Sequence, residues 1–137
     1  MNGLPFAILL VDDDEDDRII IDEAFVAIGY ECEVKKFIDG EALLRYLEKV
    51  EPELYPSLIV LDHSLTKLNA PEILELLKKD DRYRHIPVVI YSTVIPPQKK
   101  KDLLEMGAYA CWEKGSLISD VVGAAEKLRD FAVQNQK

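Results

Sequence analysis

The segment FAILLVDDDEDD, residues 6–17, joins a continuously apolar run to six consecutive acidic residues. A short apolar run with β-branched residues is typical of a strand that is covered on both faces of a parallel sheet. Residues 15–28 then place apolar side chains at helical spacing, and Gly29 follows as a C-terminal stop signal. The segment therefore predicts a βα unit at the start of the chain.

The same alternation continues through the chain. Further strands are predicted at 31–37, 58–61, 88–91 and 109–112, and helices from an Asp39 cap, from Pro71 to Lys79, from Pro96-Pro97 to Met106, and from a Ser116 cap to about Val133. Successive βα units predict an α/β fold with parallel strands and helices on both faces. The strand at 31–37 is the least apolar, so we expect it at an edge and the order 2-1-3-4-5, the flavodoxin-like doubly wound arrangement. No repeat or linker interrupts the pattern, which predicts one domain over residues 1–137.

Composition excludes several classes of function. The chain is 48% apolar and 31% charged, as in folded soluble domains, and its 17 basic and 26 acidic residues give a net charge of −9. That balance argues against non-specific binding to nucleic acid or anionic membranes. No apolar run approaches the ~20 residues of a membrane span, and no signal peptide is evident, so we expect a cytoplasmic protein. Cys32 and Cys111 fit no metal-ligand spacing and are interpreted as small buried residues.

Acidic residues follow the first and the third predicted strands. Acids at a helix N-terminus complement the helix dipole, and this accounts for residues 14–17. Asp12 and Asp13 instead abut a buried strand, where like charges repel and lose hydration. A divalent cation would compensate, and oxygen-rich sites suit Mg²⁺. Because ligands lie beyond the carboxyl ends of such strands, the topology also brings Asp62 to this pair.

Polar residues follow the fourth and fifth predicted strands as well. Ser92 and Thr93 offer hydroxyls that can donate to a phosphoryl oxygen, and Lys114 offers an ammonium that can pair with Asp62 or with a phosphoryl group. Each of these residue types is common in loops. The ends of strands one, three, four and five carry, in order, an acid pair, a single aspartate, a hydroxyl and a lysine. This ordered set is much more specific than any one of its members.

The segments ILLVDDDEDD, LIVLDHSL, IPVVIYST and GAYACWEK carry this set in order, and through them the chain resembles the receiver domains of two-component response regulators over essentially its whole length. It looks most like the stand-alone receivers of the chemotaxis and phytochrome-linked kind. The resemblance implies that Asp62 accepts a phosphoryl group from a sensor histidine kinase or a phosphotransfer protein, assisted by Ser92 and Lys114. Such a protein catalyses only its own phosphorylation and dephosphorylation.

The resemblance also implies a metal site and a mode of output. Mg²⁺ would be held by Asp13 directly, by Asp12 at or just outside its inner coordination sphere, by Asp62 and by the backbone carbonyl of Ser64. The acyl phosphate would draw the Ser92 hydroxyl toward it and shift a pre-existing equilibrium around the fourth and fifth strands. The sequence carries no DNA-binding or enzymatic domain, so we expect output through a downstream protein target. The family commonly docks or dimerises through the region corresponding to residues 96–133, which makes a homodimer through this face an alternative to a monomer.

Four positions depart from the family pattern. Thr66 stands where the family usually has Pro, Ala70 where it usually has Gly, and Gly115 where Pro usually follows the lysine, often in a cis peptide. Cys111 replaces the usual switch aromatic. Trp112 is adjacent but points to the opposite side of a regular strand, so an aromatic-rotamer switch is not expected.

Two other functions remain open on the sequence. A degenerate receiver that acts only as an interaction module is compatible with the departures at Thr66, Ala70 and Gly115. A small phosphatase of the haloacid-dehalogenase type would use the DxD motif of residues 12–14, but it needs a further acidic pair near the fourth strand and leaves Asp62 without a role. A nucleotide or flavin site is excluded, because six acids after the first strand would repel phosphate.

Overall fold

The computed structural model describes residues 6–30, 33–65 and 67–134, in which five strands alternate with five α-helices. The strands are β1 (Phe6–Val11), β2 (Glu33–Phe37), β3 (Leu58–Leu61), β4 (Val88–Ser92) and β5 (Ala110–Glu113). The helices are α1 (Glu15–Ala27), α2 (Gly40–Lys49), α3 (Ala70–Lys79), α4 (Pro97–Glu105) and α5 (Ile118–Gln134), and a short 3₁₀ turn, η1 (Pro52–Leu54), precedes β3. No helix in these ranges has the length and apolar composition needed to cross a bilayer.

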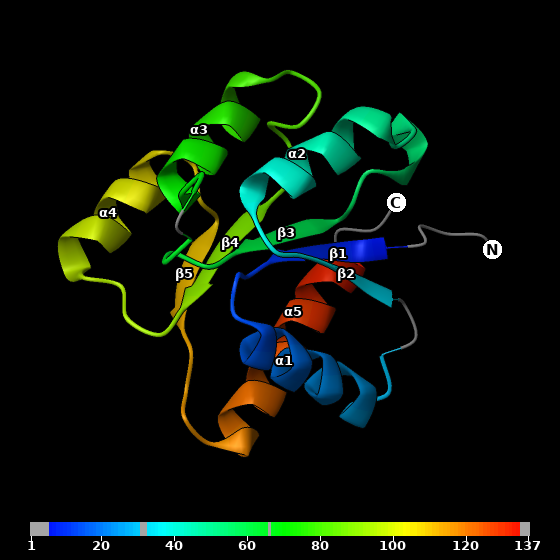
Figure 1. Ribbon diagram of the computed structural model, residues 1–137, viewed down its shortest axis with the longest axis vertical. Coiled ribbons are helices and arrows are strands. Elements are labelled where there is room, and N and C mark those ends of the chain that lie inside the picture. The colour runs from blue at the N-terminus through cyan, green and yellow to red at the C-terminus, as the bar shows by residue number, and fades with distance from the viewer. Residues whose placement is uncertain (1–5, 31–32, 66, 135–137) are drawn as a thin grey trace.

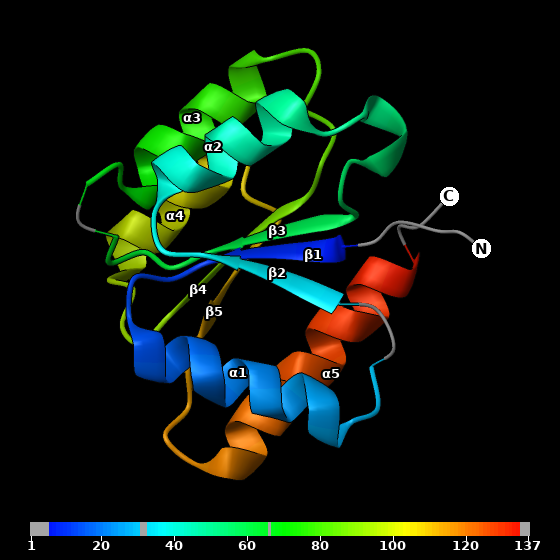
Figure 2. The same cartoon turned by 45° about the vertical axis from the view of Figure 1, so that its right-hand side comes forward.

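The strands form one parallel sheet in the order β2-β1-β3-β4-β5, which confirms the predicted topology (Figure 1). Strand β2 lies at an edge, as its weaker apolar character indicated. Figure 2 shows α1 and α5 on one face of the sheet and α2, α3 and α4 on the other. From β1 the chain first adds β2 on one side and then β3, β4 and β5 on the other, while all strands stay parallel. The loops that follow β1 and β3 therefore leave the same edge of the sheet side by side.

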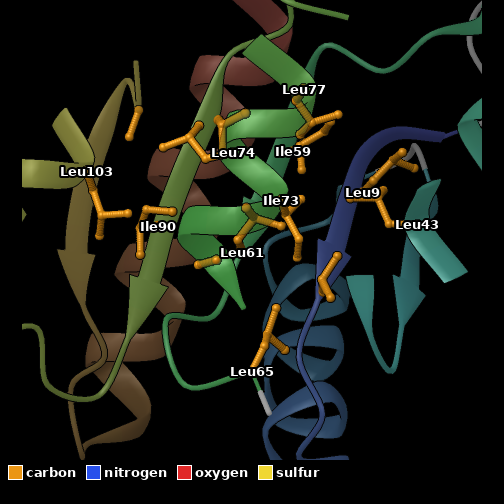
Figure 3. Close-up of a cluster of buried hydrophobic side chains, with 14 of the residues drawn as sticks. Leu9, Leu43, Ile59, Leu61, Leu65, Ile73, Leu74, Leu77, Ile90 and Leu103 are labelled. Carbon is orange, nitrogen blue, oxygen red and sulfur yellow. The ribbon is translucent and has the colours of Figure 1, made fainter. Parts of the chain in front are cut away.

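The core consists of two apolar layers, one on each face of the sheet. Successive residues of β1 alternate between them: Leu9 packs toward α2 and α3, whereas Ile8 and Leu10 pack toward α1 and α5. Figure 3 shows the first layer, in which fully buried side chains of β1, β3 and β4 meet those of α3. Burial of one such leucine or isoleucine contributes roughly 1.5–3 kcal/mol, so these layers hold the carboxyl ends of the strands in fixed positions.

Helix ends follow the local sequence closely. The Asp14 side chain caps α1 by accepting from backbone N–H groups of its first turn, and Asn69 and Glu72 form a capping box at the start of α3. Gly29 and Gly107, just after α1 and α4, have positive φ angles of 72° and 113°, a region that glycine adopts without strain. Gly29 ends its helix as predicted, and Gly107 follows α4 in the same way.

The prediction for the start of α5 was wrong. The helix begins at Ile118 rather than after a Ser116 cap, because the Asp120 carboxylate reaches back and accepts from the Leu117 N–H at 3.1 Å. The described residues contain no cis peptide bond, so the bond between Lys114 and Gly115 is trans. Cys111 is buried on the α4 side of the sheet while Trp112 packs on the α5 side, as the strand alternation predicted. The predictions for Cys32 and Thr66 fall outside the described residues.

Candidate functional site

Three carboxylates converge at the carboxyl edge of the sheet. Asp12 and Asp62 directly follow β1 and β3, whose last residues, Val11 and Leu61, are paired in register. Asp12 is 3% exposed and Asp62 is 7% exposed, whereas Asp13 lies at the surface. One oxygen of each of the three acids lies within 4.8 Å of those of the others. The structure therefore brings together the acids that the topology predicted.

Ser92, the last residue of β4, fixes one oxygen of Asp62. Its fully buried Oγ donates to Asp62 Oδ1 at 2.8 Å, and the backbone N–H of Ser64 donates to the same oxygen at 2.9 Å. Ser64 is exposed on the loop between β3 and α3, two residues after Asp62. With Oδ1 held by two donors, the second oxygen of Asp62 is left to face Lys114.

Lys114 follows β5 and directs its ammonium into the acidic cluster. Its Nζ lies 2.6 Å from Asp12 Oδ2, 3.0 Å from Asp17 Oδ2 and 3.2 Å from Asp62 Oδ2, and its side chain is only 12% exposed. The backbone N–H of Lys114 donates to the Ser92 carbonyl at 2.8 Å, which anchors the lysine to β4. An ammonium has three hydrogens to donate, and here three carboxylates accept them.

Burial and charge act in opposite directions on the pKa values of the site. Burial raises the pKa of Asp12 even though Lys114 stabilises its anion. Burial also acts to raise the pKa of Asp62, but the Ser64 N–H, the Lys114 charge and the Ser92 hydroxyl outweigh it and lower the net pKa. Burial acts to lower the pKa of Lys114, and the hydrogen bond and charge of Asp12 overcome this and raise it. At neutral pH, Asp62 is therefore an anion beside a cation.

Sequence reasoning missed two residues of α1. Asp17 was assigned to the helix dipole, yet its carboxylate contacts Lys114. Arg18 donates through Nη1 to the Asp12 carbonyl at 2.6 Å and ties α1 to the end of β1. A signal for Asp17 was present, because it lies four residues before the buried Ile21 and so continues the inward face of α1 by one turn toward the site.

Comparisons with known proteins agree with this geometry. The family model described as the response regulator receiver domain matches residues 8–126. Over 91 residues, the chain is 36% identical to the probable methanogenesis regulatory protein FilR2 of Methanothrix harundinacea, covering 65% of this chain and 59% of that protein. Over 92 residues, it is 32% identical to the response regulator Rcp1 of Synechocystis sp., covering 65% of this chain and 63% of Rcp1. The matched segments thus span about three fifths of these two relatives.

Solved structures show the same fold. The phosphorylated cyanobacterial phytochrome response regulator RcpA superposes with a TM-score of 0.81 at 28% identity, covering 92% of each chain. The Mn²⁺-bound form of Rcp1 gives a TM-score of 0.79 at 23% identity, covering 95% of this chain and 94% of Rcp1. The family match extends over most of the sequence, and the chain belongs to the response regulator receiver domain family.

Proposed function

We propose that this chain is a phosphoacceptor in a two-component phosphorelay, with Asp62 as the residue that takes the phosphoryl group from a sensor histidine kinase or a phosphotransfer protein. The observation that carries the proposal is the environment of the Asp62 carboxylate: Ser92 and Ser64 hold one oxygen, and the other faces the Lys114 ammonium. Asp12 is held more tightly, because its Oδ2 lies 2.6 Å from Lys114 Nζ, whereas Asp62 Oδ2 lies 3.2 Å from it. RcpA, similar in sequence and fold, is described in its phosphorylated form.

The proposed reaction is an in-line transfer. Asp62 Oδ2, the oxygen that faces Lys114, attacks phosphorus. The P–N bond of the donor phosphohistidine breaks, and its electron pair leaves with the imidazole. The positive charge of the Lys114 ammonium offsets negative charge on the equatorial phosphoryl oxygens. The Ser92 hydroxyl is within reach of the new acyl phosphate. Positioning and electrostatics supply most of the acceleration in such transfers.

The carboxylate cluster fits a divalent cation. Its donors are all oxygens, their ligand atoms lie within 4.8 Å of one another, and Asp13 is open to water, which suits a Mg²⁺ ion that retains several water ligands. We propose Asp12, Asp13, Asp62 and the Ser64 carbonyl as its ligands, with Asp12 at or just outside the inner coordination sphere. When bound, the ion would neutralise charge on the transferred group. Rcp1 is described with Mn²⁺ bound.

The remaining features of the proposal concern the whole chain. Residues 1–137 are proposed to form a single cytoplasmic receiver domain whose chemistry is limited to its own phosphorylation and dephosphorylation. Its signal would pass to a downstream protein through the 96–133 face, which exposes Leu104, Met106 and Tyr109. A homodimer through this face is the alternative use of the same surface.

Intact-mass spectrometry tests the phosphoacceptor role. The wild-type protein, incubated with acetyl phosphate and Mg²⁺ and quenched in acid over a series of short times, is expected to gain one phosphoryl group. The Asp62→Asn variant should gain none, and omission of Mg²⁺ with added chelator should prevent the gain. Asp81→Asn, a change of an exposed acid far from the site in sequence, is the matched control and should behave as wild type.

Two results would contradict this proposal. An adduct that persists in Asp62→Asn would place the phosphoryl group on another side chain. Absence of an adduct in the wild type at every quench time, together with unchanged amide signals of Asp13 and Asp62 on addition of Mg²⁺, would favour the interaction module instead.

A further inference from the structure

We propose that Asp17 is a positioning residue for Lys114, holding the ammonium so that its remaining N–H points at Asp62. The inference rests on the proposed phosphoacceptor function and deepens it, because nothing in the resemblance assigns a role to Asp17. The contact between Lys114 Nζ and Asp17 Oδ2, at 3.0 Å, is shorter than the 3.2 Å contact between Nζ and Asp62 Oδ2.

The contact differs from an ordinary surface ion pair. Exposed pairs contribute little because water screens them and both side chains lose freedom. Here the Lys114 side chain is only 12% exposed and that of Asp17 is 36% exposed. Glu15 and Asp16 occupy the same helical turn and are exposed. A favourable interaction with the helix dipole would be satisfied by any of these acids, but only Asp17 turns toward the site.

The backbone of Asp17 is itself held in place. Its N–H donates to the capping carboxylate of Asp14 at 3.2 Å, and the neighbouring Arg18 donates to the Asp12 carbonyl. The first turn of α1 is therefore held by its own N-cap residue, Asp14, and the Arg18 side chain ties it to Asp12, the residue that follows β1. A carboxylate mounted on this turn has few ways to move, which is what a positioning group requires.

The number of donors on Lys114 explains why Asp17 can position the ammonium without blocking the reaction. The three hydrogens of the ammonium are directed to Asp12, Asp17 and Asp62. After transfer, a phosphoryl oxygen replaces Asp62 Oδ2 as the acceptor of the third hydrogen, and the other two contacts can stay. Without Asp17, a flexible four-carbon chain would be held by Asp12 alone at the moment when the Asp62 contact is exchanged.

The test compares two substitutions that differ in one property. Asp17→Asn keeps an oxygen acceptor but removes the charge, whereas Asp17→Ala removes both; Asp16→Ala, in the same turn but exposed, is the control. We expect ¹³Cε relaxation of Lys114 to show a rigid side chain in the wild type, Asp17→Asn and Asp16→Ala, and a mobile one in Asp17→Ala. The rate of phosphorylation by acetyl phosphate with Mg²⁺ should stay within about twofold for Asp17→Asn and fall about tenfold for Asp17→Ala.

Three results would overturn the inference. Lys114 could stay rigid in Asp17→Ala, or it could become mobile there while the phosphorylation rate stays unchanged. The rate could also change equally in Asp17→Asn and Asp17→Ala, which would mean that only the charge of Asp17 matters. Failure of the proposed function is distinguishable from these. It would appear as a wild-type protein that is not phosphorylated at all. In that case the ¹³Cε relaxation of Lys114 would still test whether Asp17 positions the ammonium.

Discussion

At the scale of single residues, buried polar groups of this protein fall into two kinds. Ser92 is fully buried, and its hydroxyl donates to Asp62. Tyr83 is also buried, at 3% exposure, but among the described residues its hydroxyl has no hydrogen-bond partner. The Ser92 hydroxyl belongs to the site, whereas the Tyr83 hydroxyl loses hydration without compensation and its pKa rises to about 12 because of burial.

This predicts a specific pH dependence for Tyr83. The unfolded chain releases the Tyr83 proton near pH 10, while the folded protein retains it to about pH 12. The contribution of Tyr83 to the free energy of unfolding is therefore fully present below pH 10 and is lost as the pH rises toward 12. Tyr83→Phe should make that fall shallower and, at pH 7, should be neutral or stabilising by up to about 1 kcal/mol. Urea unfolding at pH 7 and 11 measures both effects, with the exposed Tyr109→Phe as control. A Tyr83→Phe variant destabilised by more than about 1 kcal/mol at pH 7 would show that the hydroxyl has a partner.

At the scale of elements, the connection from β5 to α5 explains one departure from the family. A Cβ on Gly115 would collide with the side chain of Asp120, which accepts from the Leu117 N–H at the start of α5. The absence of a side chain at residue 115 thus allows Asp120 to cap the helix. The same residue follows Lys114, so the cap and the position of the lysine share one short loop.

A double-mutant cycle tests this arrangement. Gly115→Ala should destabilise the protein by about 2 kcal/mol through overpacking, and Asp120→Gly by about 2 kcal/mol through loss of the cap and lower helix propensity. In the double variant the collision is removed, so its loss of stability should be smaller than the sum of the two by at least about 1 kcal/mol. Urea denaturation gives the three values. Strict additivity would mean that residues 115 and 120 do not compete for the same space.

The same loop shows where prediction from sequence succeeds and where it fails. Strands β1 and β3 were predicted with their observed bounds, because each is an uninterrupted apolar run with a proline at most two residues before it and an aspartate directly after it. The start of α5 was misplaced because Ser116 carries a stronger local capping signal than an aspartate that reaches back from within the helix. Local sequence specifies the existence of an element better than the side chain that ends it.

The site was likewise predicted in part from the sequence and missed in part. Asp12 and Asp62 could be placed together because strand order alone brings the ends of β1 and β3 side by side. The contact between Asp17 and Lys114 depends on the rotational phase of α1 and on a side-chain rotamer, and strand order fixes neither. The spacing of Asp17 and Ile21 indicates the face of α1 on which Asp17 lies, but it does not specify the contact with Lys114.

At the scale of the whole molecule, the protein concentrates negative charge at one end of a fold that is already acidic, with a net charge of −9. The apolar layers on both faces of the sheet oppose that repulsion, because they fix the ends of β1 and β3 next to each other. Folding thus brings Asp62 to the adjacent pair Asp12 and Asp13, from which the unfolded chain keeps it apart. An ion that binds only the cluster stabilises the folded state by mass action.

Mg²⁺ should therefore raise the free energy of unfolding, by about 2.7 kcal/mol at a free concentration one hundred times its dissociation constant. Asp13→Asn should remove most of this gain without harming the metal-free fold, because Asp13 is exposed and its side chain belongs to neither apolar layer. Asp16→Asn, an equal change of charge three residues along, should keep the gain and so separates coordination from general screening. NaCl at matched ionic strength provides the second control, since the Debye length of ≈10 Å at 0.1 M screens exposed charges whatever the ion. Equal stabilisation of the wild type and Asp13→Asn by Mg²⁺ would mean that the ion acts on the overall charge and not on the carboxylate cluster.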